Sequence, residues 1–245
     1  LTRNNFNGLA AYEEKDETPF RFGSFTTMGE LYVETGLNEL RMSNYRRILS
    51  LDSAMVVVQF DKDGVQYQRK YFISYPDSVM VMKFTANQSG KQNLILSYCP
   101  NSEAKSNLRA DGKDGLVYTG VLDNNGMKFA FRIKAIHKGG TLEAENDRLI
   151  VKGADEVVFL LTADTDYKMN FNPDFKDPKT YVGNDPEQTT RIMMDQAVQK
   201  GYDELYRNHE ADHTALFNRV RLQLNPDISS PNLPTYQRLA NYKKG

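Results

Sequence analysis

The stretch Met127–Ala135, MKFAFRIKA, decides the fold class because apolar and charged residues alternate along it. Successive side chains of a β-strand point to opposite faces, so residues two apart share a face. The apolar residues fall on one predicted face: Met127, Phe129, Phe131, Ile133 and Ala135. Lys128, Arg132 and Lys134 fall on the other. The pattern predicts a strand with one buried side and one side in water.

Further strand-like runs surround this one between about Met28 and Asp164. They are GELYVET, SAMVVVQF, VQYQRKYFI, SVMVMKFT, QNLILSY, GLVYTGV, RLIVKG and EVVFLLTA. Turn signals separate them, among them Lys62-Asp63-Gly64, Asn125-Gly126 and Lys138-Gly139-Gly140. No helical run lies between them, which excludes a parallel sheet built from βαβ units. About nine strands with short turns predict a mainly β protein, an antiparallel sandwich of two packed sheets.

The pattern changes after Asp164. A polar, aromatic loop leads to Asp185-Pro186, which is typical of a helix cap followed by proline at the first helical position. Helix is predicted from Pro186 to about Lys200, and again after Gly201 as far as LFNRV. VRLQL then alternates like a last strand. The segment from Asn225 onward is rich in Pro, Ser and Asn, which predicts a linker before a helix-like end at Tyr236–Tyr242.

Composition excludes several classes of partner. The chain has 245 residues and a formal net charge of −1, from 31 basic and 32 acidic residues, so it lacks the positive field that attracts nucleic acid. No run reaches the ~18 apolar residues of a membrane helix. We therefore predict no nucleic-acid and no membrane partner. Cys99, the single cysteine, can form no internal disulfide and is predicted to be a small buried residue on a strand.

The sequence HEADH, His209–His213, matches the zinc-protease pattern H-E-x-x-H. Such a site needs a third protein ligand. No histidine or glutamate follows His213, Asp227 lies in the predicted linker, and His137 has no metal-ligand spacing. Both motif histidines instead continue the apolar stripe of the predicted helix. We interpret them as structural histidines and predict no metal site and no cofactor.

The remaining chemistry-bearing patterns are weak. The chain has no G-x-S-x-G, no phosphate-binding loop and no dinucleotide fingerprint. The carboxylate pairs Asp164/Asp166 and Glu143/Glu145 have the residue types that glycoside hydrolysis uses. Among 32 acidic residues such spacings arise by chance, and both pairs fit solvated strand edges and turns. No catalytic residue is predicted in this chain.

A carbohydrate-binding module is the alternative for a sandwich without catalytic residues. Such modules stack sugar rings on exposed aromatic side chains, often tryptophan, and this chain has no tryptophan. Tyr167, Phe171 and Phe175 in the long loop are the aromatic residues that would take that role. We favour the interpretation that they anchor the loop to the sandwich.

FGSFTTMGELYVE contains a G-[DE]-L-Y segment, and YRRILSLDSAMVVVQFDKDGVQYQRKYFISYPD contains Y-R-R-x-L-x-L-x-x-A and Y-x-R-x-Y-F-x-S-Y-P-D segments. In these segments the chain resembles the N-terminal β-domain of glycoside hydrolase family 95. KGYDELYRNHEADHTALFNRVRLQL and LPTYQRL resemble its later segments, so the resemblance extends from about Phe22 to Gly245. Tyr236 stands where the family carries Asp or Asn, and Thr235 can cap that helix instead.

The resemblance implies an inverting α-L-fucosidase, typically acting on α-1,2-linked fucose, with some members acting on α-L-galactosides. In inverting hydrolysis an acid protonates the leaving oxygen while a second group activates water on the opposite face. The family carries its catalytic residues in an (α/α)6 barrel after the linker, so none is assigned to this chain. The expected role is a non-catalytic domain that supports that barrel in degrading fucosylated glycans.

The resemblance also sets the expected domain organisation and location. Residues 1–27 are expected to be an incomplete N-terminal lead-in, residues 28–224 a β-supersandwich domain with a helical insert at 186–218, and residues 225–245 a linker toward the absent barrel. The glycan substrates of the family imply a periplasmic or secreted protein. His209 and Asp212 match the family pattern and are expected to tie the helical insert to the sandwich.

Overall fold

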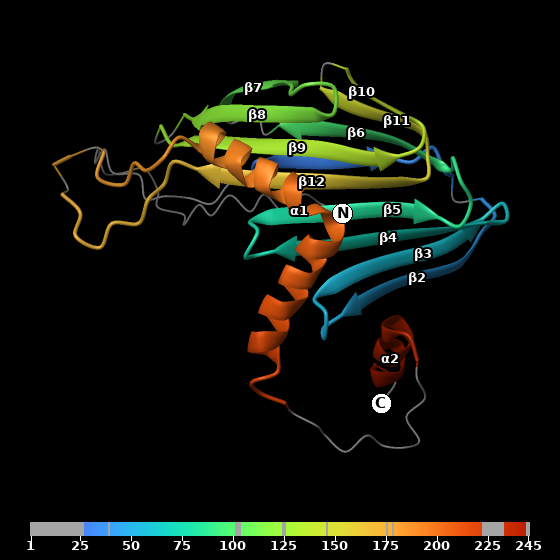
Figure 1. Cartoon of the computed structure of the whole chain (residues 1–245). Coiled ribbons are helices and arrows are strands. Elements are labelled where there is room, and N and C mark those ends of the chain that lie inside the picture. The colour runs from blue at the N-terminus through green and yellow to red at the C-terminus, as the bar shows by residue number, and fades with distance from the viewer. Residues whose placement is uncertain are drawn as a thin grey trace.

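Two antiparallel sheets form the body of the protein in the computed structural model (Figure 1), which describes residues 27–38, 40–100, 104–123, 126–145, 147–174, 176–177, 179–221 and 233–243. The four-stranded sheet has the order β1 (Gly29–Glu34), β6 (Gln92–Pro100), β11 (Arg148–Ala154), β10 (Thr141–Glu145). The eight-stranded sheet has the order β2 (Met42–Ser50), β3 (Met55–Lys62), β4 (Val65–Ser74), β5 (Val79–Ala86), β12 (Glu156–Thr165), β9 (Lys128–Lys138), β8 (Gly115–Leu122), β7 (Ala104–Ala110). The predicted sandwich class is confirmed.

All nine runs between about Met28 and Asp164 that the sequence marks as strands are strands, and three further strands, β2, β7 and β10, are added by the structure. Each of the three lies at an edge of its sheet. Edge strands have fewer neighbours to pack against, and β2 is exposed at nearly every position. β2 and β7 therefore lack the regular apolar alternation that reveals the others, and β10 alternates over only five residues.

The core lies between the two sheets. The predicted apolar face of β9 is part of it, since Phe129, Phe131, Ile133 and Ala135 are all buried there. The ring of Phe131 stacks on Tyr98 from β6, with 4.9 Å between the ring centroids. Cys99, the next residue along β6, is exposed. The prediction that Cys99 is buried is wrong, because Leu94, Leu96 and Tyr98 take the inward positions of the alternation.

The helix α1 (Pro186–Phe217) covers the other face of the eight-stranded sheet, over β12, β9, β4 and β5 (Figure 1). Met194, Ala197 and Leu205 of α1 are buried there against a second apolar cluster of the sheet, which includes Phe72, Val79, Val81, Val158 and Leu160. The sequence predicts that Arg132 faces water, but it is only 2% exposed. The prediction is wrong because the helix packs over this part of β9.

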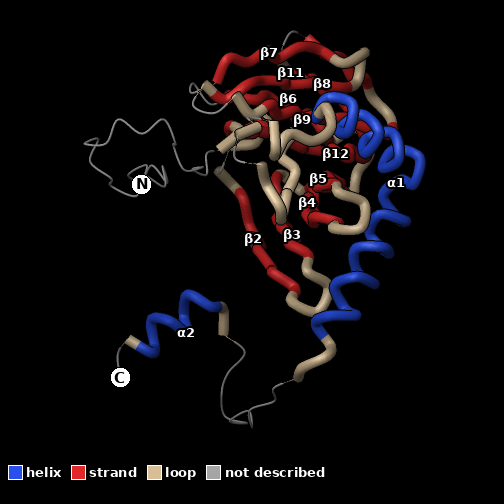
Figure 2. Tube along the Cα trace, turned by 90° about the vertical axis from the view of Figure 1, so that its left-hand side faces the viewer, coloured by secondary structure: helices blue, strands red, loops and turns tan. Residues whose placement is uncertain are grey.

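The boundaries of α1 agree with the sequence signals. The Asp185 carboxylate accepts a hydrogen bond from the Glu187 backbone N–H at 3.1 Å, and Pro186 occupies the first turn. Gly201 interrupts the helix with φ 70° and ψ 173°, a left-handed backbone that favours glycine. Figure 2 shows the two halves of α1 running in different directions along the side of the strands. The predicted interruption at Gly201 is confirmed.

The segment after α1 differs in part from the prediction. Val220 and Arg221 are not in a strand, and the rest of the predicted strand VRLQL lies outside the described residues. The helix α2 (Thr235–Tyr242) occupies the predicted helical end, but no side chain caps it, so Thr235 does not replace the missing cap. Within the described part of the chain, neither helix has the length and apolar character needed to cross a membrane.

Candidate functional site

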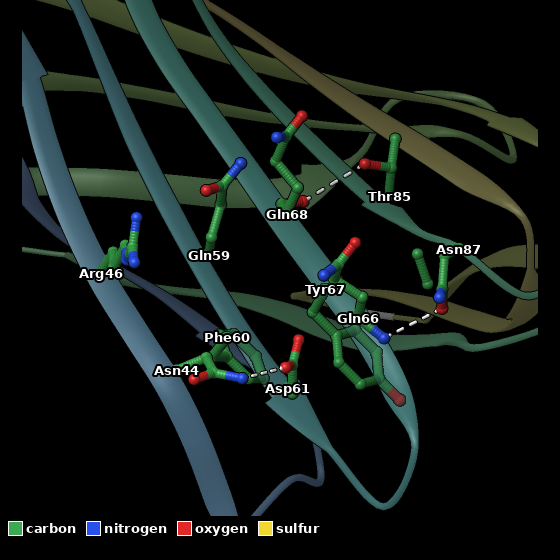
Figure 3. Close-up of a pocket in the computed structure, with 11 residues that line it drawn as sticks. Asn44, Arg46, Gln59, Phe60, Asp61, Gln66, Tyr67, Gln68, Thr85 and Asn87 are labelled. Carbon is green, nitrogen blue, oxygen red and sulfur yellow. Dashed lines mark hydrogen bonds between the residues drawn. The ribbon is translucent and has the colours of Figure 1, made fainter.

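A surface cavity lies over β2, β3, β4 and β5, and we call it the β2–β5 hollow (Figure 3). Its volume is about 610 Å³. The residues that line it are mostly polar: Asn44, Arg46, Gln59, Phe60, Asp61, Gln66, Tyr67, Gln68, Thr85, Ala86 and Asn87. No single run of the sequence marks this site, because its residues come from four different strands and the ends of those strands.

Strand register places the amide side chains of the hollow next to one another. Gln59 on β3 pairs with Gln68 on β4, and Asp61 pairs with Gln66. Directly paired residues of adjacent strands point to the same face of a sheet. Gln68 also pairs with Thr85 on β5, so three strands contribute polar groups to one row. The only sequence signal is the Q-Y-Q alternation at Gln66–Gln68, which puts both glutamines on one face.

Most of these amides have free hydrogen-bonding capacity. The Asn44 side chain donates to the Asp61 carboxylate at 2.6 Å, and Asn87 accepts from the Gln66 backbone N–H at 2.9 Å. The side-chain amides of Gln59, Gln66 and Gln68 make no hydrogen bond to another described residue. The hollow therefore presents unused donors and acceptors to an incoming polar ligand.

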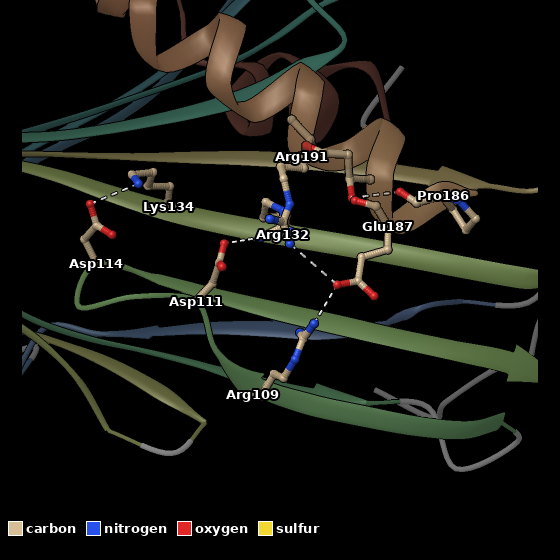
Figure 4. Close-up of polar contacts among 10 residues, drawn as sticks. Arg109, Asp111, Asp114, Arg132, Lys134, Pro186, Glu187 and Arg191 are labelled. Atoms are coloured by element: carbon tan, nitrogen blue, oxygen red, sulfur yellow. Dashed lines mark hydrogen bonds and ion pairs between the residues drawn. The ribbon is translucent and has the colours of Figure 1, made fainter. Parts of the chain in front are cut away.

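A cluster of arginines and carboxylates fastens the start of α1 to the far end of the same sheet (Figure 4). The Arg109 guanidinium lies 2.6 Å from the Glu187 carboxylate, and Arg191 lies 3.9 Å from the same oxygen. Arg132 donates to the Asp111 carboxylate from Nη1, while its Nε and Nη2 are buried without a hydrogen-bond partner among the described residues. The cluster is an interface between helix and sheet, with its carboxylates already paired to cations.

A buried carboxylate holds the middle of α1. Asp77, in the turn between β4 and β5, accepts hydrogen bonds from Ser74 at 2.5 Å, Lys200 at 2.6 Å and Asn208 at 3.1 Å. Burial acts to raise the pKa of Asp77, but the hydrogen bonds from Lys200, Ser74 and Asn208 outweigh it and lower that pKa. A carboxyl group that stays ionised cannot serve as a general acid. Sequence reasoning missed this contact because Asp77 and Lys200 are 123 residues apart.

The histidines of HEADH fasten the last third of α1 to the turn between β2 and β3. Nε2 of His209 donates to the backbone oxygens of Ser53 at 3.1 Å and Ala54 at 3.2 Å. Nε2 of His213 donates to the Leu51 oxygen at 2.7 Å. His209 is 6% exposed, and its ring stacks on Phe72 at 4.9 Å. His209 thus makes the contact between insert and sandwich that the sequence predicts for it.

The other residues of the zinc pattern have no metal-like arrangement. The Glu210 carboxylate accepts a hydrogen bond from the Tyr206 hydroxyl at 2.9 Å. Among the described residues, no three His, Cys, Asp or Glu side chains gather closely enough to hold a metal ion. His137, at the end of β9, contacts the Gly139 backbone oxygen at 2.7 Å through Nδ1. Asp212 makes no hydrogen bond or ion pair with the described part of the chain, so no contact supports a tie there.

The two carboxylate pairs from the sequence do not form a catalytic site. Glu143 and Glu145 are exposed on the edge strand β10, as predicted. Asp164 accepts from the Thr165 backbone N–H at 2.9 Å. Asp166 is only 7% exposed, and it accepts from the Lys128 backbone N–H at 2.9 Å. The prediction that Asp166 is solvated is wrong, because its carboxylate fastens the loop after β12 to β9.

The sequence predicts that Tyr167, Phe171 and Phe175 anchor the aromatic loop after β12. Tyr167 stacks on Tyr181 of the same loop with 6.0 Å between centroids, and it is half exposed. Phe171 is 94% exposed, so it does not anchor the loop, and the prediction is wrong for this residue. Phe175 lies outside the described residues. Polar contacts join the two sides of the loop to each other, such as the hydrogen bond from the Asn170 side chain to the Thr180 backbone oxygen at 3.1 Å.

Comparison with known families places this fold among the glycoside hydrolases. Residues 3–170, which include all twelve described strands, match the family model for the glycosyl hydrolase family 65 N-terminal domain. The structure named "Putative kojibiose phosphorylase from human microbiome" superposes with a TM-score of 0.52 at 10% sequence identity. The match covers 75% of this chain and 27% of that chain, and it shows a likeness of fold.

Two curated relatives are similar along most of the sequence. "Probable alpha-fucosidase A" of Aspergillus niger is 27% identical over 239 residues, which cover 93% of this chain and 29% of the relative. "Alpha-L-fucosidase 2" of Arabidopsis thaliana is 25% identical over 249 residues, which cover 89% of this chain and 29% of the relative. The chain thus spans less than a third of the length of either relative. These matches confirm the resemblance to the N-terminal domain of a glycoside hydrolase.

Proposed function

Because the chain belongs to the glycosyl hydrolase family 65 N-terminal domain family and is related to α-fucosidases, we propose that it is the non-catalytic N-terminal domain of an inverting α-L-fucosidase of glycoside hydrolase family 95. The observation that carries the proposal is that two relatives named as α-fucosidases align along 93% and 89% of this chain. The domain would support a catalytic barrel that degrades fucosylated glycans.

The geometry of the described carboxylates supports a non-catalytic role. Inverting hydrolysis uses two groups about 6.5–9.5 Å apart, one of them an acid with a raised pKa. The buried carboxylates Asp77 and Asp166 are both occupied by protein donors. Hydrogen bonds and ion pairs from Lys83 and Lys138 outweigh the effect of burial on Glu156 and lower its pKa. These groups act as structural acceptors, and the catalytic pair would reside in the barrel.

The partners follow from this role. We propose the barrel of the same enzyme as the protein partner and a fucosylated glycan as the substrate of the full-length enzyme. Such a substrate is consistent with a periplasmic or secreted protein. The near-neutral net charge of −1 supports a role without nucleic acid.

An assay of fucose release tests the proposal. This chain and the full-length Aspergillus niger relative would be incubated with a 2′-fucosylated glycan at equal concentration. We expect turnover by the relative and none by this chain. Cooperative thermal unfolding of the chain would show that its inactivity does not reflect misfolding. Turnover by the isolated chain comparable with that of the relative would refute the proposal.

A shortened form of the same relative tests the supporting role. Deletion of the matching first part of the relative should lower the melting temperature of the remainder and reduce its turnover. This chain alone, added in excess to the substrate, should release no fucose. A truncated relative with unchanged melting temperature and unchanged turnover would show that the domain does not brace the barrel.

A further inference from the structure

We propose that the β2–β5 hollow binds a neutral carbohydrate. The hollow occupies the same face of the eight-stranded sheet as α1, beyond the part that the helix covers. Its volume of about 610 Å³ falls within the roughly 300–1,000 Å³ that is usual for small-molecule sites. The size suits a short oligosaccharide.

The kind of polar group identifies the ligand class. A side-chain amide offers two N–H donors and one carbonyl acceptor, so it can satisfy a hydroxyl group in either sense. Gln59, Gln66 and Gln68 present three such amides on neighbouring strands (Figure 3). Adjacent strands lie about 4.7–4.9 Å apart. Gln59 and Gln68 are paired at this spacing, and Gln66 lies two residues from Gln68 along β4. Amides placed in this way match a ligand with hydroxyl groups along its length, which is the chemistry of a sugar chain.

The charge of the hollow argues against ionic ligands. Arg46 and Asp61 are the only charged residues among the described ones that line it, and their charges balance. The Asp61 carboxylate already accepts a hydrogen bond from Asn44. A phosphate or sulfate group would need an excess of cations, and a cationic ligand would need an excess of carboxylates. A neutral polar ligand needs neither, so the site favours a neutral sugar over a charged one.

The strands beneath the amides are held firmly. Phe60 and Tyr67 are buried and stack across β3 and β4, with 5.2 Å between ring centroids and 16° between ring planes. The Arg69 guanidinium lies over the Phe60 ring at 5.0 Å. This packing fixes the backbone that carries Gln59 and Gln68, so less conformational freedom is lost when a ligand binds.

Titration of the 15N-labelled chain with 2′-fucosyllactose tests the proposal, with lactose and inorganic sulfate as comparison probes. We expect saturable shifts of the side-chain amide signals of Gln59, Gln66 and Gln68 with at least one of the two sugars. Sulfate should cause no saturable shift at these positions. Absence of saturable shifts with both sugars, or saturation by sulfate alone, would overturn the proposal.

Two variants show whether the shifts arise from the hollow. The double substitution Gln59→Ala and Gln68→Ala should weaken sugar binding roughly ten-fold or more, because each amide supplies hydrogen bonds to the ligand. Gln196→Ala, at an exposed position of α1, is the matched control and should bind like the unchanged chain. Equal affinity of all three proteins would place the sugar elsewhere. Unchanged backbone amide spectra away from the hollow would confirm that the double variant is folded.

Discussion

One face of the eight-stranded sheet has two regions, one open to solvent and one covered by a helix. On β4, Gln66 and Gln68 lie in the open β2–β5 hollow, while Phe72, on the same face, is buried beneath α1. On β5, Thr85 faces the hollow and Val81 lies under the helix. Along each strand the apolar residues of this face coincide with the part that the helix covers. The covered region holds the helix on the sandwich, and the open region keeps polar groups available for a ligand.

The largest expected effect is in the covered region. Leu205→Ala should lower the free energy of unfolding by about 3 kcal/mol, because Leu205 is fully buried between α1 and the sheet and its truncation leaves a cavity. Leu216→Ala is the control on the same helix at a position that is 57% exposed, and it should cost less than about 1 kcal/mol. Urea unfolding measures both. Equal losses would mean that α1 is not held by this cluster.

Loss of the Asp77 contact should have the second-largest effect on stability. Asp77→Ala should destabilise the protein by about 2 kcal/mol, because it removes the acceptor of Lys200 and Asn208 inside the helix–sheet interface. Asp195→Ala changes an exposed carboxylate of α1 and should lie within about 0.5 kcal/mol of the unchanged chain. Urea unfolding of both variants at pH 7 makes the comparison. A loss no greater than that of Asp195→Ala would show that the pair contributes no stability.

The same residue gives a pH dependence with a defined sign. The pKa of Asp77 is lowered in the folded state, so its contribution is present above the unfolded value of about 3.9 and is lost as the pH falls through the folded pKa. The stability difference between the unchanged chain and Asp77→Ala should therefore narrow as the pH falls from about 6 to about 3. Urea unfolding of both proteins at several pH values measures this difference. A difference that widens at low pH would contradict the assignment.

His209→Ala should lower the free energy of unfolding by about 1–2 kcal/mol, because it removes the donor to two backbone oxygens and the stacking on Phe72. His137→Ala, at the end of β9, is the comparison and should lower the free energy of unfolding by less than His209→Ala does. Urea unfolding measures both variants.

Metal analysis of the purified chain should find no stoichiometric zinc. Zinc that is present in the unchanged chain and lost in His209→Ala would contradict the structural role of the histidines and support a zinc site.

The smallest effect is expected in the open region. Gln68→Ala should change the free energy of unfolding by no more than about 0.5 kcal/mol, since the amide makes no contact that the fold requires. Thermal unfolding of this variant and of Leu205→Ala compares how much the open and the covered region of the sheet contribute to stability. A loss above about 1 kcal/mol would mean that the hollow is part of the structural core.

Local patterns in the sequence account for much of the fold. Alternation finds the strands that bury one face, and Asp185-Pro186 and Gly201 mark the start and the interruption of α1. These patterns do not show what covers the second face, which is why they predict Arg132 in water. The Asp77–Lys200 contact and the Gln59–Gln68 pairing depend on how distant segments meet. No single run of residues carries that information.

The exposed edge strand β2 bears on self-association. An edge strand has one row of backbone groups free to pair with another chain, and β2 also exposes Tyr45, Ile48 and Leu49. Two features oppose such pairing. The register with β3 shifts between Ser43 and Arg46, which breaks the regular ladder, and Arg46 with Arg47 would bring positive charges of two chains together. This irregular, charged segment therefore opposes the pairing of two chains along β2.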